Sequence, residues 1–98
     1  MIWVTFWTLN PGVGPSKIAE VAAELMQKGL WPPKEGKVLG WYVCPGGRGV
    51  TIMDSEDATG EQAFRNFVTW TKELPGIFAS YETMPAVTAE KAVKITLE

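Results

Sequence analysis

The segment VCPGGRGV (residues 43–50) brings together a cysteine, an arginine and three glycines, residue types found in nucleophilic sites, anion sites and phosphate-binding loops. A phosphate-binding loop needs a helix directly after its glycines, so that backbone N–H groups converge on the anion. Here the strand-like run Val50-Thr51-Ile52 follows instead. Because glycine adopts positive φ readily, the segment is interpreted as the turn of a β-hairpin.

Cys44 and Arg48 in this segment could each have a chemical role or a structural one. The chain contains no histidine, so neither a Ser–His nor a Cys–His pair can form, and Cys44 is interpreted as an unreactive thiol. Arg48 could bind a carboxylate ligand or pair with an acidic group across a dimer, and the structural role is preferred.

Outside this segment, Asp54 and Glu82 on predicted strands are the candidate acid or base groups, and the default interpretation is that they are solvated charges at the sheet edge. One cysteine without histidine excludes the usual zinc sites, and no cofactor or metal is predicted.

Aromatic residues are the other candidates, because five tryptophans in 98 residues is a high count. Most are expected in the core or an interface, but any that line a cavity could orient an aromatic or lipophilic ligand. Trp31, beside two prolines, could act as a lid. The candidate ligand-binding residues are therefore Asn10, Trp7, Trp41, Arg48, Asp54, Trp70 and Tyr81.

The first half of the chain predicts strand, helix and hairpin. β-Branched and aromatic residues fill 2–9 before the turn Asn10-Pro11-Gly12. Ser16 is predicted to cap a helix that ends at Gly29. Apolar positions of this helix recur at i, i+3, i+4, i+7 and i+8: Ile18, Val21, Ala22, Leu25 and Met26. Strands are expected at 38–44 and 48–55, joined by the hairpin turn.

The second half predicts another helix and another strand. Thr59 with Gln62 fits a capping box, or Asp57 caps the helix a turn earlier. The helix should end at Pro75-Gly76. Its expected buried face comprises Phe64, Phe67, Val68, Thr71 and Leu74. A fourth strand is expected at 78–84, and the tail from Thr88 either forms a short helix through Lys94 or adds an edge strand at KITLE.

This order predicts one α+β domain over residues 1–98, the ferredoxin-like β-α-β-β-α-β arrangement with both helices on one face of an antiparallel sheet. Both faces of the strands are apolar. In the first strand Ile2, Val4 and Phe6 alternate with Trp3, Trp7 and Leu9, and in the second Leu39, Trp41 and Val43 alternate with Val38, Tyr42 and Cys44. Because an uncovered apolar sheet face is unusual in a soluble monomer, we expect a homodimer in which a second copy covers it.

Charge and composition disfavour several other classes of binding partner. A formal net charge of −2 disfavours nucleic acid and anionic membranes. Arg48-Gly49 opens a strand as in RNA-recognition motifs, but Val50 to Met53 lack the aromatics that stack on bases. A single cysteine cannot close a disulfide within the chain, and the N-terminus lacks a signal-peptide pattern, so a cytoplasmic protein is expected.

Several segments resemble one known family, the small proteins catalogued as domain of unknown function 3303 within the dimeric α/β-barrel superfamily. They are TLNPG after the first strand, PPKEGKVLGWYVCPGGRGVTIMDSED with Leu39-Gly40, Trp41 and Gly47-Arg48-Gly49, and the run from Trp70 to YETMPAV. The chain departs from the family pattern at 28–31, where GLW is added before the prolines. The resemblance implies a ferredoxin-like fold that dimerises through its sheets, and it brings no known catalytic residue.

Function is left open by these observations. Members of the wider superfamily resemble cofactor-independent monooxygenases, isomerases, haem-binding enzymes and stress-induced barrels, and the missing histidine disfavours haem. One hypothesis is a barrel that binds a small aromatic or lipophilic ligand between sheet and helices, or acts on it as a monooxygenase-like or isomerase-like enzyme. The other is a non-catalytic dimeric module whose aromatics all belong to core and interface. Whether the chain is an enzyme is not decided by its sequence.

Overall fold

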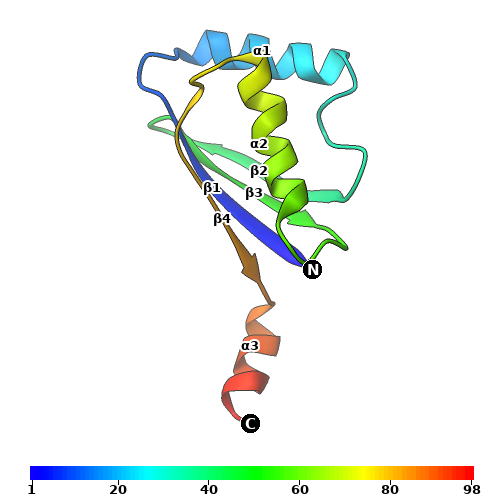
Figure 1. Ribbon diagram of the computed structural model, residues 1–98. Helices are drawn as coiled ribbons and strands as arrows, with labels where there is room; N and C mark the ends of the chain where they lie inside the picture. The colour runs from blue at the N-terminus through cyan, green and yellow to red at the C-terminus, as the bar shows by residue number, and fades with distance from the viewer.

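A four-stranded antiparallel sheet carries helices on one face in the computed structural model, which describes residues 1–98 (Figure 1). The elements are β1 (Ile2–Leu9), α1 (Pro15–Gln27), β2 (Lys37–Cys44), β3 (Arg48–Asp54), α2 (Glu61–Glu73), β4 (Phe78–Ala86) and α3 (Ala89–Thr96). The strand order across the sheet is β2-β3-β1-β4, so that the first strand lies inside it. The fold is α+β. None of its helices has the length and apolar character needed to cross a bilayer.

Turns and caps explain where the elements begin and end. Asn10 Oδ1 accepts a hydrogen bond from the Gly12 N–H (3.1 Å), which forms the predicted turn after β1. The predicted Ser16 cap is wrong: α1 begins at Pro15, whose ring already sets the φ of a first helical residue. The predicted hairpin turn is confirmed, with Gly46 and Gly47 at φ of +94° and +71°.

Asp57 bonds to the N-terminus of α2, but the helix begins at Glu61 with Gly60 at the N-cap and not a turn earlier as the Asp57 alternative predicted. The Asp57 carboxylate accepts hydrogen bonds from the backbone N–H groups of Thr59 (2.7 Å) and Gln62 (2.9 Å). The Thr59 side chain is bonded to the same carboxylate (2.7 Å), so the Thr59–Gln62 capping box does not form.

The buried face of α2 differs from the predicted one. Its buried residues are Gln62, Ala63, Asn66 and Trp70, whereas Phe64 is 66% exposed. Two polar side chains are buried because they bond to each other and to the sheet: Gln62 Nε2 to Asn66 Oδ1 at 3.0 Å, and Asn66 Nδ2 to Met53 Sδ at 2.7 Å. Hydrophobic periodicity misses such a face, because paired amides replace two of its apolar residues.

A hydrophobic cluster that includes several tryptophans fills the space between α1, α2 and the sheet. Its buried members are Val21, Leu25, Trp31, Trp70 and Ile77. Trp31, a candidate lid, is only 4% exposed, because the backbone N–H groups of Leu30 and Trp31 bond to the Leu25 carbonyl and turn the chain inward. The ring centroids of Trp31, Trp41 and Trp70 lie 5.4–5.8 Å apart. Trp31 is therefore a core residue.

The two faces of the sheet separate as predicted in β1. Thr5 and Trp7 are buried under the helices, and Phe6 on the opposite face is 50% exposed. In β2 the predicted alternation is wrong, because the register shifts between Val38 and Gly40, and Val38 and Trp41 both pack against the helix-side core. Tyr42 stays on the uncovered face, in a cross-strand row with Val50, Phe6 and Glu82. We call this uncovered face the open sheet face.

The tail adopts the helical alternative. α3 is capped by Thr88, whose Oγ1 accepts from the Lys91 N–H at 3.2 Å. Figure 1 shows it continuing beyond the end of β4, away from the sheet and from both other helices.

Candidate functional site

Four of the predicted ligand-binding residues meet at one place. Trp7, Trp41, Trp70 and Tyr81 line a cavity between the sheet and the helices. Its volume is about 40 Å³, against the roughly 300–1,000 Å³ typical of small-molecule pockets. The indole rings fill this space themselves, and Trp7 Nε1 donates to Thr51 Oγ1 at 3.1 Å. These side chains are brought together as predicted, but as a packed core without room for a ligand.

Asn10 lies in a neighbouring groove. The groove has about 600 Å³, lies between the loop after β1 and the β2–β3 turn, and includes Cys44 in its wall. It shares Leu9, Ile18 and Val43 with the small cavity, so the two are adjacent. Asn10 Oδ1 already accepts from the Gly12 N–H, which gives this side chain a local structural role.

Arg48 and Asp54 lie apart from the tryptophans. They occupy the two ends of β3 on the open sheet face, opposite the helices. Asp54 Oδ1 accepts a hydrogen bond from the Met1 ammonium group at 3.1 Å. Glu82 is on the same open face in β4, opposite Phe6. The structure therefore divides the predicted site residues between two faces and does not assemble them into one site.

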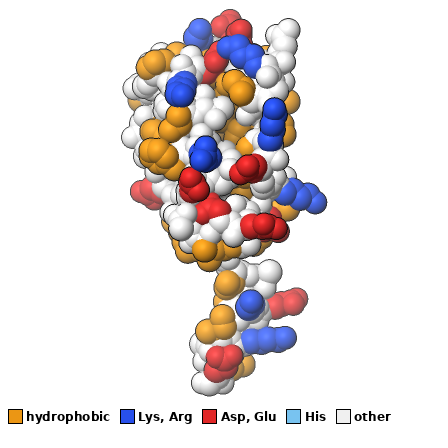
Figure 2. Space-filling model, turned by 45° about the vertical axis from the view of Figure 1, so that its right-hand side comes forward, with side chains coloured by type: hydrophobic (Ala, Val, Ile, Leu, Met, Phe, Trp, Pro, Cys, Tyr) orange, Lys and Arg blue, Asp and Glu red, His pale blue; other side chains and the backbone are white.

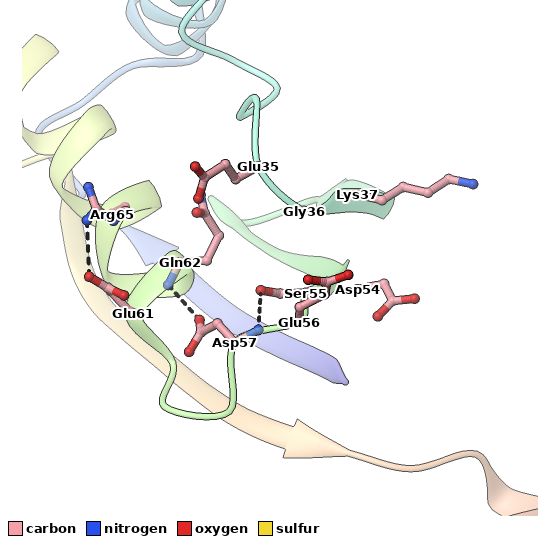
Figure 3. Close-up of a pocket in the computed structure, with 10 residues that line it drawn as sticks. All are labelled: Glu35, Gly36, Lys37, Asp54, Ser55, Glu56, Asp57, Glu61, Gln62 and Arg65. Atoms are coloured by element: carbon pink, nitrogen blue, oxygen red, sulfur yellow. Dashed lines mark hydrogen bonds and ion pairs between the residues drawn. The ribbon is translucent and has the colours of Figure 1, made fainter.

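A polar groove lies beside the N-terminus of α2 and was missed apart from Asp54 (Figure 3). It has about 660 Å³ and no hydrophobic residue in its wall. Its lining residues are Glu35, Gly36, Lys37, Asp54, Ser55, Glu56, Asp57, Glu61, Gln62 and Arg65. The charges are partly engaged: Arg65 pairs with Glu61 at 3.0 Å, and Asp57 caps the helix. No three acidic, cysteine or histidine side chains are arranged to hold a metal ion.

Hydrogen bonding shifts the acidity of Asp57. The Gln62 N–H, then the side chain and N–H of Thr59, hold the pKa of the Asp57 carboxyl well below its usual range. Asp57 is therefore ionised at neutral pH. Its carbonyl oxygen also accepts a hydrogen bond from Trp3 Nε1 at 3.1 Å, so the loop before α2 is bonded to β1.

A second groove, with aromatic walls, lies between α2 and the helix-facing side of β1 and β4. Trp3, Phe64, Phe67 and Tyr81 form its walls together with Thr59, Gly60, Ala63 and Thr83, and we call it the aromatic groove. Its volume is about 440 Å³, within the usual range of small-molecule sites. The rings of Phe64 and Phe67 are stacked at 6.2 Å, and Tyr81 meets Phe67 edge-on at 5.0 Å. These rings offer flat apolar surfaces to a ligand.

The polar atoms of the aromatic groove are held by hydrogen bonds. Tyr81 Oη donates to the Ala63 carbonyl at 3.2 Å, and burial raises the pKa of Tyr81 to about 12, so the phenol stays neutral. Thr83 Oγ1 bonds to Thr5 Oγ1 at 2.9 Å. The groove contains hydroxyl groups beside apolar walls but no base next to a nucleophile.

Sequence reasoning identified only Tyr81 among the residues of the aromatic groove. Trp3 was assigned to core or interface, and Phe64 and Phe67 to a buried helix face. Two spacings could have indicated the groove. Phe64 and Phe67, three residues apart, share one side of a helix, and Tyr81 and Thr83, two apart, share one face of a strand.

A family model and a solved structure each match most or all of the chain. The family model described as Domain of unknown function (DUF3303) matches residues 1–98. No curated protein matches the chain. Among solved structures, the crystal structure of an Agrobacterium tumefaciens protein, a structural-genomics target, has 13% sequence identity and a TM-score of 0.49, and the match covers 91% of this chain and 96% of that one.

Proposed function

Because the chain belongs to the DUF3303 family, whose description assigns no activity, we propose from its geometry that it is a dimeric domain that binds a small aromatic or lipophilic molecule. The observation that carries this proposal is the aromatic groove, with about 440 Å³ beside four aromatic side chains. Phe64 gives the strongest support for a ligand in this groove, because 66% of its side chain is exposed although its ring stacks on the half-buried Phe67. A bound aromatic molecule would cover this ring.

The finer fold assignment is part of the same proposal. A β-α-β-β-α-β order followed by a C-terminal helix, with α1 and α2 covering one face of the sheet, supports a ferredoxin-like domain over residues 1–98. The open sheet face supports a homodimer, since Phe6, Tyr42 and Met84 are 50%, 59% and 43% exposed there. A second copy packed sheet to sheet would remove these side chains from water and complete a dimeric α/β barrel.

Native mass spectrometry of the protein purified from its source tests both parts. The proposal expects a dimer with extra mass that is absent after denaturation, and that mass identifies the ligand. A monomer at micromolar concentration would contradict the dimer. A dimer without extra mass would support the dimer, and ligand binding would then be tested by direct titration.

The titration uses anilinonaphthalene sulfonate as a fluorescent aromatic probe and compares two variants with exposed apolar positions. Phe64→Ser removes a wall of the aromatic groove, and Met26→Ser changes a side chain of similar exposure (53%) on α1, outside the groove. Loss of one aromatic contact should raise the probe Kd about tenfold for Phe64→Ser. Met26→Ser should bind as the unchanged protein does. Equal affinities for all three proteins would refute binding in the groove.

A non-catalytic structural module is the second candidate, favoured by one observation. Trp7, Trp31, Trp41 and Trp70 pack so closely that only about 40 Å³ remains between sheet and helices. The tryptophan excess is then explained by the core alone. Failure of a broad lipophilic library to shift the melting temperature would favour this candidate.

A further inference from the structure

The helix α3 has an apolar stripe with nothing packed on it. Its apolar members recur at the i, i+3, i+4 and i+8 spacing of one helix face: Ala89, Ala92, Val93 and Leu97, the last at the C-terminal cap. Thr96 occupies the i+7 position, where its hydroxyl donates to the Ala92 carbonyl at 2.8 Å. No residue of α3 is buried, and Val93 and Leu97 are 57% and 81% exposed. Figure 2 shows the helix standing apart from the body of the protein, with apolar side chains exposed beside charged ones.

Local interactions are too weak to hold this helix on their own. It has eight residues, whereas isolated helices shorter than about 12–15 residues are marginal in water. The Thr88 cap, Glu90 in the first turn and Lys94 in the last each contribute only about 1 kcal/mol or less. A stable α3 therefore needs a surface against which its stripe can pack.

The surface available is a second copy of the same chain. Only Val87 and Thr88 separate α3 from β4, and Met84 and Val87, 43% and 53% exposed, continue the apolar surface from the open sheet face toward the helix. The helix carries Glu90 with Lys91 and Lys94, and Glu98 follows it, so the side-chain charges of this segment sum to zero and two copies do not repel each other strongly there.

The size of the interface supports the same partner. Four strands spaced about 4.8 Å apart and about 25 Å long offer a flat face of about 500 Å². A stable interface usually buries about 800 Å² of accessible surface on each partner, and accessible surface follows the side chains and exceeds the flat footprint. α3 adds its own exposed side chains to this surface at the end of β4.

We propose that α3 is a dimerisation arm, which packs its apolar stripe on a second copy of the chain and extends the interface formed by the open sheet face. This inference rests on the proposed dimer. It assigns to the C-terminal helix a part of the interface that continues from the open sheet face.

The test is the dimer Kd of full-length variants, measured by sedimentation equilibrium. Val93→Gln with Leu97→Gln removes the stripe but keeps good helix formers and leaves the charge unchanged. Glu90→Gln with Lys91→Gln is the matched control, since it makes the same replacement on the polar side without changing net charge. Each dimer contains two arms, so loss of four apolar side chains should raise the Kd about 100-fold or more, while the control stays within about threefold.

A third variant separates the arm from the sheet. Tyr42→Ser changes an exposed residue of the open sheet face, far from α3 in sequence. If Tyr42→Ser weakens the dimer but Val93→Gln with Leu97→Gln does not, the sheet interface stands and the arm is refuted. If the stripe variant weakens the dimer and Tyr42→Ser does not, the arm is supported and the sheet interface is not. A monomeric wild-type protein that keeps α3 helical would overturn the inference.

Discussion

Gly49, the second residue of β3, is the position where adding a single methyl group should destabilise the fold most. A Cβ built there overlaps the ring of Trp7 and the carbonyl oxygen of Tyr42 on the neighbouring strand, with Trp7 Cη2 at 2.5 Å. Neither obstacle can move easily. The Trp7 ring is 6% exposed and bonded to Thr51, and the carbonyl is part of the backbone of β2.

The cost follows from that rigidity. Overpacking a close-packed core typically costs about 1–3 kcal/mol, and here the methyl group meets a buried ring and a backbone atom together. We therefore expect Gly49→Ala to lower the free energy of unfolding by about 3 kcal/mol. Urea unfolding followed by tryptophan fluorescence measures this change, at one fixed protein concentration because a dimer couples stability to concentration.

Two other glycine-to-alanine variants serve as controls. At Gly12 the nearest atom to a new Cβ is Asn10 Oδ1 at 3.6 Å, an ordinary contact, so the change should stay within about 0.5 kcal/mol. At Gly40 the Cβ lies 2.6 Å from the ring of Tyr42, which is 59% exposed and can swing away, so the cost should stay below about 1 kcal/mol. The reasoning is refuted if Gly49→Ala is as stable as the wild type, or if Gly40→Ala costs as much as Gly49→Ala.

Three further variants test the cap, the groove and the core. Asp57→Asn should lower the urea midpoint at pH 7. Because the folded pKa of Asp57 is depressed, its contribution is present above the unfolded pKa of about 3.9 and is lost as pH falls toward the folded pKa, so the two proteins should converge in strong acid. Tyr81 has its pKa raised to about 12, so wild-type stability should fall between about pH 10 and 12, whereas Tyr81→Phe should lose about 1 kcal/mol at neutral pH and show a weaker alkaline loss. Trp31→Ala should cost about 3–5 kcal/mol of unfolding free energy, as expected for a core residue, and a change under 1 kcal/mol would return it to the role of a lid.

The strands and helices were predictable because their patterns are local. Alternation in 2–9, the spacing of apolar residues from Ile18 to Met26 and the Pro45-Gly46-Gly47 turn each depend on neighbouring residues only. The errors have long-range causes. Asn66 is buried because Met53, on another element, accepts its hydrogen bond, and Val38 joins Trp41 because the register shifts within a strand pair.

The candidate site was predictable only in part, for a related reason. Trp7, Trp41, Trp70 and Tyr81 were among the predicted ligand-binding residues and line one space, but a sequence does not show whether such rings enclose space or fill it. The aromatic groove depends on which side of α2 faces the sheet. Once Gln62 and Asn66 take the buried side, Phe64 is turned out beside Tyr81 and Thr83.

The position of β1 inside the sheet also constrains how the protein is made. The strand IWVTFWTL is synthesised before both of its partners, because β3 and β4 begin only at Arg48 and Phe78. One edge of this apolar strand therefore stays open until β3 has been synthesised at Asp54, and the other stays open until β4 has been synthesised at Ala86. Unpaired apolar strands are prone to aggregate. Expression yield should depend on chaperones and on translation speed between β3 and β4 more than on the stability of the finished domain.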